Sequence, residues 1–250
     1  MQKSEDADNQ QGQALSYVVG VYFGDGCVDT AWRNQDGTER KRVRLRAIDQ
    51  DFVERTALSI QQAFNVECRR GMDNSKRFGK KPLHLITAMS GVGEYLESIT
   101  DRRRFIPNLI YQTKENTRQF IIGLLDSEGW VSFQFQELGR FYIEVGIGMT
   151  SEHMGEFIRM LNNAGVITHK VKTKKYPSGK VMKLTKFNVD SFLRSGIRFN
   201  CSRKQNRIDS YLNAIKSLKE SGMYYANGAS FNDYKRTFRE SVQDTLRTNV

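Results

Sequence analysis

The chain has 250 residues, and its lysines and arginines outnumber its aspartates and glutamates by 39 to 28, a formal charge of +11. This length allows one large domain or two small ones. The charge favours a polyanionic partner, nucleic acid first, because phosphate neutralisation releases counterions. The apolar stretches are too short to span a membrane, and no helix pairs a lysine-rich face with a broad apolar one. We therefore expect a soluble protein with no membrane partner.

The N-terminal segment 1–13, "MQKSEDADNQQGQ", is polar and acidic and lacks the apolar core of a signal peptide. We expect it to be disordered and the protein to be intracellular, in the cytoplasm of a bacterial or phage-infected cell or in an organelle matrix. The three widely spaced cysteines fit reduced thiols better than a disulfide framework. No zinc-site spacing occurs among Cys27, Cys68, Cys201, His84, His153 and His169.

The predicted elements occur twice along the chain. Residues 16–24, "SYVVGVYFG", and 119–127, "QFIIGLLDS", are apolar nearly all round, which predicts two buried helices. Alternating runs joined by a turn follow at 27–48 and 130–149 and predict β-hairpins. Further helices are predicted at 49–64 and 150–165, second hairpins at 66–89 and 166–189, and short helices at 91–99 and 189–197.

This repetition predicts an α+β protein of two pseudo-symmetric halves, each with the order αββαββα. The expected boundaries are a first domain at 14–103, a linker at 104–116, a second domain at 117–220 and a C-terminal extension at 221–250. Residues 202–220 predict an additional helix. A last helix, packed outside the second half, is predicted from the apolar face Phe231, Tyr234, Phe238, Val242 and Leu246.

The predicted strands carry polar side chains on one face. Alternation places four arginines on one side of a first-half strand: Arg40, Arg42, Arg44 and Arg46. The second half offers Ser132, Gln134, Gln136, Arg140 and Tyr142 in one hairpin and Lys170, Lys172, Lys174 and Lys183, with Lys175, Lys180 and Lys186, in the other. Such a face is often only solvated. Its recurrence in both halves favours DNA, where arginine reads guanine, glutamine reads adenine and lysine holds phosphate.

Each apolar helix ends in small and acidic residues. Small residues four apart let two helix backbones approach closely, and we expect the two helices to pair through Gly20, Gly24, Gly123 and Ser127. We predict that Gly26 and Gly129 end the helices in left-handed turns. Asp25 and Glu128, 103 residues apart, would then be the last helical residues.

Two carboxylates at adjacent helix C-termini repel each other and the partial negative charge of the helix ends. A hard cation relieves this repulsion, so Asp25 and Glu128 point to a Mg²⁺-type site. The alternative is that each acid only caps a turn. Their paired occurrence at equivalent places in a basic, duplicated chain favours the metal site.

"VVGVYFGDG" and "IIGLLDSEG" resemble the two copies of the motif that names the LAGLIDADG homing endonucleases, and the resemblance covers residues 14–220. The second copy differs by conservative changes. The first copy has Phe23 and Gly24 in place of the first acid and the alanine. The resemblance implies a monomeric, pseudo-two-fold enzyme whose motif helices form the domain interface. Two saddle-shaped antiparallel sheets would straddle double-stranded DNA.

The resemblance also implies site residues. Asp25 and Glu128 would be catalytic and would bind Mg²⁺ together with Gly24 and Ser127, with Mn²⁺ as a substitute and Ca²⁺ supporting binding without cleavage. Asp126 matches an acid that is structural in the family. The family has a basic residue near each of its two active centres. The candidates are Arg103 or Arg104 for one centre and Arg203 or Lys204 for the other, and we predict Arg104 and Lys204 as the catalytic ones. Asp49 and Ser151 would support the site, and plain phosphate contact is the alternative for each basic residue.

The expected function is metal-dependent hydrolysis of both strands of a long asymmetric DNA target, leaving short 3′ extensions and promoting intron mobility. One rival is an RNA maturase that assists splicing of its own group I intron, with or without nuclease activity. Another is a non-catalytic DNA-binding protein. Retention of Asp25 and Glu128 favours cleavage. Intein splicing is not expected, because the chain lacks a C-terminal His-Asn pair and starts with Met.

Overall fold

The computed structural model describes residues 2–73, 83–89, 91–135, 141–149, 152–179 and 181–220. Its first half contains α1 (Gln2–Phe23), β1 (Cys27–Arg33), β2 (Glu39–Ala47), α2 (Gln50–Phe64), β3 (Arg69–Asp73), β4 (Leu83–Ala88) and α3 (Val92–Thr100). A 3₁₀ turn, η2 (Asn108–Tyr111), leads to α4 (Lys114–Glu128), β5 (Gly129–Phe135), β6 (Phe141–Met149), α5 (Met154–Asn163), β7 (Lys172–Lys175), β8 (Val181–Lys186), α6 (Val189–Arg194) and α7 (Ser202–Glu220). Outside the described residues lie the predictions for Gln136, Arg140, Ser151, Lys180 and the extension 221–250.

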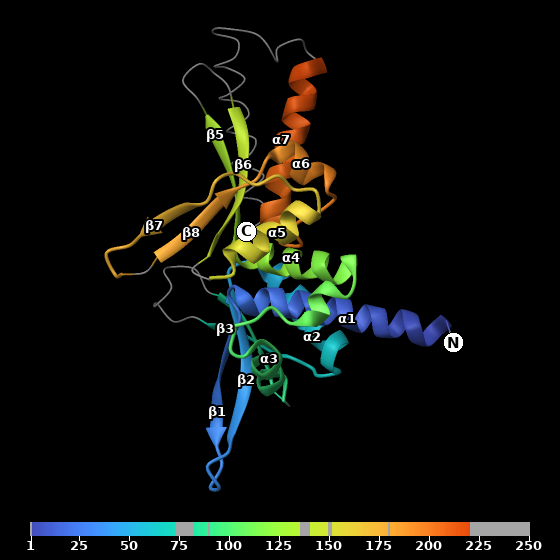
Figure 1. The fold of residues 1–250 in the computed structure, drawn as a ribbon, viewed down its shortest axis with the longest axis vertical. Helices are drawn as coiled ribbons and strands as arrows, with labels where there is room; N and C mark the ends of the chain where they lie inside the picture. Colours follow the sequence, from blue (N-terminus) through green and yellow to red (C-terminus); the bar gives the residue numbers. More distant parts are fainter. Residues whose placement is uncertain are drawn as a thin grey trace.

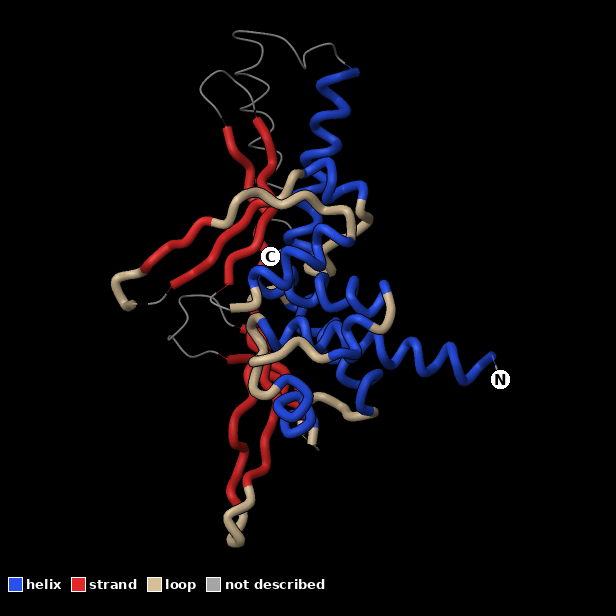
Figure 2. Tube along the Cα trace, viewed as in Figure 1, coloured by secondary structure: helices blue, strands red, loops and turns tan. Residues whose placement is uncertain are grey.

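The strands form two four-stranded antiparallel sheets, one from each half, with the orders β1-β2-β4-β3 and β5-β6-β8-β7 (Figure 1). Identical strand orders confirm the α+β fold of two repeated halves. The helices gather on one side of the molecule and the strands on the other, so each sheet keeps one open face (Figure 2). Among the described helices, none is long and apolar enough to cross a membrane.

The motif helices α1 and α4 pack directly against each other. A Cβ built on Gly20 would overlap the carbonyl oxygen of Phe120 and would lie 2.9 Å from the amide nitrogen of Leu124. A Cβ on Gly123 would likewise overlap the carbonyl oxygen of Tyr17. Only glycine allows backbones to approach this closely. The predicted pairing of the two helices through small residues is confirmed.

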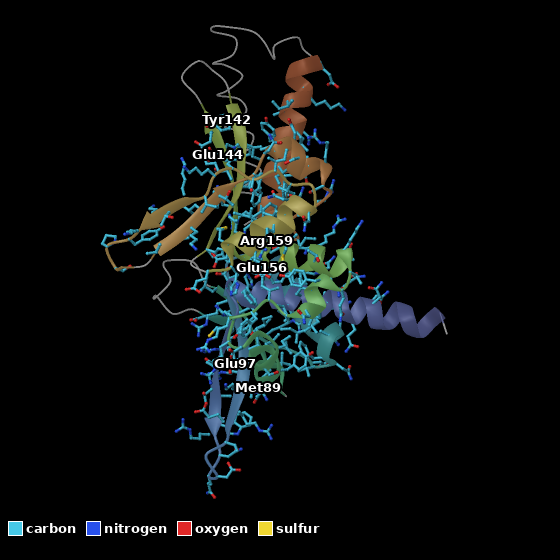
Figure 3. All side chains as sticks on the ribbon, viewed as in Figure 1. Met89, Glu97, Tyr142, Glu144, Glu156 and Arg159 are labelled. Atoms are coloured by element: carbon cyan, nitrogen blue, oxygen red, sulfur yellow. The ribbon has the colours of Figure 1, made fainter. Side chains whose placement is uncertain are left out.

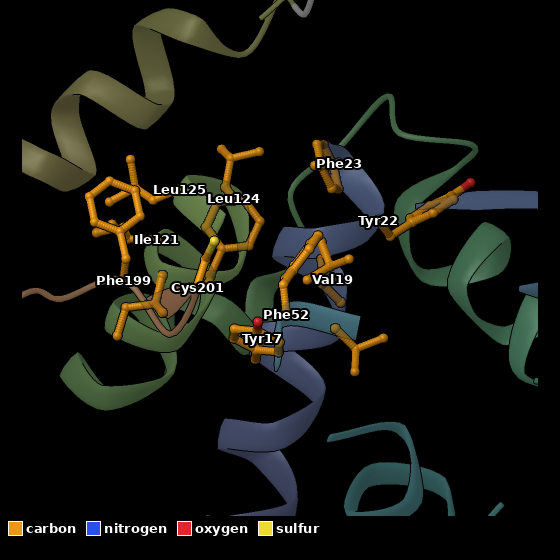
Figure 4. Packing of buried hydrophobic residues seen from close by; sticks show 14 of the residues in the cluster. Tyr17, Val19, Tyr22, Phe23, Phe52, Ile121, Leu124, Leu125, Phe199 and Cys201 are labelled. Atoms are coloured by element: carbon orange, nitrogen blue, oxygen red, sulfur yellow. The ribbon is translucent and has the colours of Figure 1, made fainter. Parts of the chain in front are cut away.

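A continuous hydrophobic core surrounds this helix pair and joins the two halves. Figure 4 shows Tyr17 and Phe52 of the first half in the same packed region as Leu124 and Phe199 of the second. Tyr17 and Phe52 are at most 2% exposed. The interface between the two halves is therefore part of the hydrophobic core. Burial of its apolar surface stabilises the fold and the pairing of the halves together.

The predicted disorder of residues 1–13 is wrong over the part that the structure describes, because α1 begins at Gln2. The buried part of α1 provides the nucleus from which the helix extends toward its N-terminus. Gln11 also donates from Nε2 to the carbonyl oxygen of Ala63 at 2.8 Å. Polar composition was therefore a poor guide to disorder here.

The predicted helix ends are partly wrong. α4 ends at Glu128 as expected, but α1 ends at Phe23, so Asp25 lies in the following turn. Gly129 is extended at φ −75°, and Gly26 is not among the positive-φ glycines, so the left-handed turns are wrong for both. Glycine is needed for space instead, because a Cβ on Gly26 would lie 2.9 Å from the Cα of Tyr22.

Candidate active centre and nucleic-acid interface

The two acidic motif ends meet at the same end of the paired helices. A Cβ on Gly24 would lie 2.9 Å from Oγ of Ser127 and 3.1 Å from Cγ of Glu128. Asp25, the next residue, is exposed, and Glu128 is partly exposed. The structure therefore brings Asp25 and Glu128 to one small region between the two halves, as the repeat predicted.

Asp25 lies in an electrostatically mixed environment. Its carboxylate is accessible, yet the surrounding protein atoms desolvate it, and this desolvation raises its pKa above the ordinary value. The positive charges of Lys204 and Arg103 act in the opposite direction. A carboxylate that desolvation penalises in its charged form is one that a bound cation would stabilise.

Asp126, by contrast, is buried, and its carboxylate oxygens accept hydrogen bonds from within the protein. It is 2% exposed and accepts hydrogen bonds from the Tyr17 hydroxyl at 2.9 Å and from the backbone amides of Asn200 and Cys201 at 2.9 and 3.1 Å. Burial raises its pKa to about 6. Because Tyr17 belongs to the first half and Asp126 to the second, this carboxylate ties the halves together and does not reach the open site.

Lys204 lies beneath the end of α4. It is 6% exposed, and its Nζ donates to the carbonyl oxygens of Leu125, Asp126 and Ser127 at 3.0, 2.5 and 3.3 Å. Burial lowers the pKa of its ammonium group, partly offset by neighbouring negative charge. A cation here neutralises the negative end of the α4 dipole. Lys204 therefore lies at the predicted site, with its three donors directed to the helix end.

In the first half, the arginine that contacts the end of the first motif is Arg103, whereas the catalytic role of Arg104 stays a prediction. Arg103 donates to the carbonyl oxygen of Gly26, and its guanidinium carbon lies 4.4 Å from the centre of the Tyr22 ring. Arg104 is exposed and forms an ion pair with Asp101 at 3.3 Å. The backbone of the intervening turn directs Arg103 toward α1, and spacing alone could not distinguish the two arginines.

The N-cap residues of two helices, Asp49 and His153, each contact the other half of the molecule. Asp49, the N-cap of α2, accepts from Nε and Nη2 of Arg203 at 2.7 and 2.9 Å. Burial alone would raise the pKa of Asp49, but the hydrogen bonds and charge of Arg203 outweigh it and hold the pKa below its ordinary value. His153, the N-cap of α5, lies with Nε2 2.8 Å from the carbonyl oxygen of Arg103. Sequence reasoning missed His153, and its only signal was its place at a strand-to-helix junction.

The open face of the first sheet carries the predicted arginines. Val43 and Leu45 of β2 are buried, so Arg42, Arg44 and Arg46, which alternate with them, lie on the opposite, open face. Arg42 and Arg44 both pair with Asp29, the first at 2.7 Å, and Arg46 pairs with Asp73 at 3.0 Å. Arg40 is exposed. A hollow of about 360 Å³ on this sheet has a lining that includes residues not predicted from the sequence, Trp32, Arg69 and Arg70, beside Arg42.

The open face of the second sheet carries uncharged polar side chains and an acid along β5 and β6. Ser132 lies opposite Glu144, and Gln134 lies opposite Tyr142, so these four side chains share one face. Figure 3 shows Tyr142 and Glu144 along β6. Glu144 pairs with Lys186 and lies 3.4 Å from Nε2 of Gln134. The predicted face is present, and an acid lies within it.

The lysines of the second hairpin divide between two faces. Lys170, Lys172 and Lys174 are exposed, and Lys172 and Lys174 pair with residues on the open face. Lys183 lies opposite Thr173 and the buried Met149, so it faces the side of the sheet that carries the helices. Its predicted place on the DNA-facing side is wrong, because an odd spacing from Lys186 reverses the side of a strand.

The site offers oxygen ligands to a metal ion. Among the described residues, no group of three or more histidine, cysteine, aspartate or glutamate side chains gathers. A cation at the motif ends would therefore take the carboxylates of Asp25 and Glu128 with backbone carbonyl oxygens; the one on Ser127 already accepts from Lys204. The Ser127 hydroxyl donates to the carbonyl oxygen of Gly123 at 3.1 Å. Such a donor set fits hard divalent cations such as Mg²⁺ or Mn²⁺.

Solved structures share this fold. The LAGLIDADG homing endonuclease I-GzeII in complex with its DNA target matches with a TM-score of 0.55 and 8% identity, over 92% of this chain and 96% of that one. I-DmoI in complex with DNA and Mn matches at 0.50 and 16%, over 74% and 94%. An I-DmoI variant with its target DNA and Mg matches at 0.52 and 16%, over 75% and 97%. No protein-family model matches the chain, and no curated protein sequence does. The chain thus has the LAGLIDADG homing endonuclease fold.

Proposed function

We propose that the protein is a site-specific DNA endonuclease that hydrolyses both strands of a long, asymmetric target with a divalent metal ion, and that it acts as a monomer. The observation that carries the proposal is the meeting of Asp25 and Glu128 at the ends of α1 and α4. These ends lie between two sheets that each have an open polar face. Promotion of intron mobility would be the biological result of such cleavage.

Asp25 and Glu128 would hold the metal ion, Mg²⁺ or Mn²⁺. A divalent cation bound there would lower the pKa of a water molecule and stabilise the leaving oxygen of the phosphodiester. The protein's own cations support the acids. Lys204 offsets the negative end of α4 beside Glu128, and the charges of Lys204 and Arg103 partly oppose the desolvation that raises the pKa of Asp25.

The two open sheet faces would bind the DNA. In the first sheet, Asp29 orients Arg42 and Arg44, so two guanidinium groups are preorganised while a net positive charge remains. In the second sheet, Gln134 and Tyr142 offer base contacts, and Lys172 and Lys174 offer phosphate contacts. Because the faces differ in chemistry, the two halves of the target should differ in sequence.

The proposal is tested by cleavage. Purified protein and Mg²⁺ would be incubated with DNA made by joining the sequences that flank the gene's intron, or with a library of random duplexes for a free-standing gene. We expect a double-strand break. The double variant Asp25→Asn/Glu128→Gln should bind the same DNA without cutting it, because its amides keep the shape but not the charge.

Intact DNA together with tight, specific binding would contradict the nuclease proposal. If the same protein bound intron RNA and accelerated splicing, the maturase function would replace it. RNA binding requires the basic faces but gives no reason to bring Asp25 and Glu128 together, so the geometry favours cleavage.

A further inference from the structure

The segment that carries Arg103 has an unusual backbone. Asp101, Arg102 and Arg103 have φ angles of 41°, 54° and 72°, so three consecutive residues with side chains are left-handed. Each such residue costs on the order of 1 kcal/mol, and the conformation persists only where the surroundings determine it. Contacts within the first half supply part of this restraint, because the amide of Arg102 donates to the carbonyl oxygen of Glu97 at 3.1 Å.

The second half supplies another restraint through His153. Its Nε2 lies 2.8 Å from the carbonyl oxygen of Arg103. A carbonyl oxygen only accepts, so Nε2 carries the hydrogen and donates it. The His153 ring packs edge-on against Phe23, with centroids 5.4 Å apart, and Oε2 of Glu156 lies 3.6 Å from its Nδ1. The imidazole, 15% exposed, is thus oriented by residues of both halves.

The restraint on Arg103 reaches the candidate active centre. With its carbonyl held by His153, Arg103 directs its guanidinium to the carbonyl oxygen of Gly26 and over the ring of Tyr22 at 4.4 Å. Gly26 directly follows Asp25 in the chain, and the Arg103 charge acts on the Asp25 carboxylate. A continuous set of contacts therefore joins α5 of the second half to the acidic end of the first motif.

The second half has a related contact without the strain. Asp49, the N-cap of α2, holds Arg203, the neighbour of Lys204, with two hydrogen bonds. In both halves, the N-cap of a helix from the other half thus secures the segment that carries the basic residue. Arg203 lies in the regular helix α7, whereas Arg103 lies in the left-handed segment, so the first half depends more on its contact.

We propose that His153 is a positioning residue that holds the segment 101–103, and through it Arg103, for the active centre of Asp25. The inference rests on the proposed function for its effect on cleavage. Docking of α5 against the first half thereby couples one active centre to the correct assembly of both halves.

The test measures each DNA strand separately. His153→Ala removes the hydrogen-bond donor, and His153→Gln keeps one on a longer, uncharged side chain. With end-labelled target under single-turnover conditions, His153→Ala should lower the cleavage rate of one DNA strand by roughly tenfold to a hundredfold. A small displacement of a positioned group lowers a reaction rate by about this factor. The other strand and DNA binding should stay within about twofold of wild type, and His153→Gln should restore most of the lost rate. Glu152→Ala changes an exposed neighbour at the same helix start and serves as the matched control.

A second measurement needs no DNA. In His153→Ala, the amides of Arg104 and Phe105, which donate to Asp101 and Thr100 in this segment, should exchange hydrogen faster than in wild type, and His153→Gln should reverse the change. Unchanged exchange, or equal slowing of both strands, would overturn the proposal. If wild type cut no DNA, the proposed function would fail while the exchange data still decided whether His153 holds the segment.

Discussion

The two acidic motif ends are equivalent in the repeat but are built differently. Glu128 ends a regular helix, and Lys204 beneath it is buried with its donors on the helix carbonyls. Asp25 lies in a turn beyond α1, and its nearby Arg103 extends from a left-handed segment. Duplication has kept the positions of the charges but not the backbone that carries them. Both basic segments contact the other half, but Arg203 lies in a regular helix, whereas Arg103 lies in a left-handed segment.

The largest expected effect is the loss of DNA cleavage when Asp25 or Glu128 is replaced. Asp25→Asn and Glu128→Gln should each lower the rate of double-strand cleavage by about a hundredfold or more, because each removes a negative ligand charge. If each acid serves mainly one strand, the residual nicks of the two variants should fall on opposite strands. End-labelled target resolves the nicks. Full activity in either variant would remove that residue from the mechanism.

The next effect concerns the helix pair. Gly20→Ala and Gly123→Ala should each lower the free energy of unfolding by about 1–3 kcal/mol, because each new methyl group overlaps a backbone carbonyl of the partner helix. Gly155→Ala, in α5 with open space around it, should change stability by about 1 kcal/mol or less, in the stabilising direction. Urea unfolding measures all three. Equal stability of Gly20→Ala and wild type would contradict the close packing.

A smaller effect tests the Asp49–Arg203 pair through pH. The pKa of Asp49 is held below its ordinary value in the folded protein, so its stabilisation is present above the unfolded pKa of about 4 and is lost as pH falls through the folded value. Asp49→Asn should therefore cost about 1 kcal/mol at pH 7, and the difference from wild type should shrink below about pH 4. A difference that grows on acidification would show the opposite sign of coupling. Urea unfolding at several pH values measures it.

The smallest perturbation compares the three thiols. Cys27 is exposed at the start of β1, whereas burial raises the pKa of Cys68 to about 11 and of Cys201 to about 12. A thiol-reactive chromogenic reagent at pH 8 should therefore modify Cys27 quickly and the other two slowly, since the thiolate is the reactive form. Cys27→Ser should remove the fast phase. A fast phase that survived this change would mean that the native packing around Cys68 or Cys201 opens readily.

Much of the fold followed from local pattern. The apolar runs, the small residues Gly20 and Gly123 and the repeat of alternating strands predicted the paired helices and both sheets. The prediction for Lys183 failed because strand faces reverse at each residue, so the observed register was needed. Arg103 and Arg104 could not be distinguished, because the left-handed segment that orients them has no glycine to announce it.

The sequence by itself determined the duplication, the acids at both motif ends and the basic strand faces, because periodicity and charge are properties of neighbouring residues. The tertiary structure decided which groups meet. Asp29 forms ion pairs with two arginines, Arg42 and Arg44. Asp126 is buried between the halves, and His153 donates to the carbonyl oxygen of Arg103. These contacts join residues far apart in the chain or depend on strand register, so they arise from how the two halves pack, which no local pattern encodes.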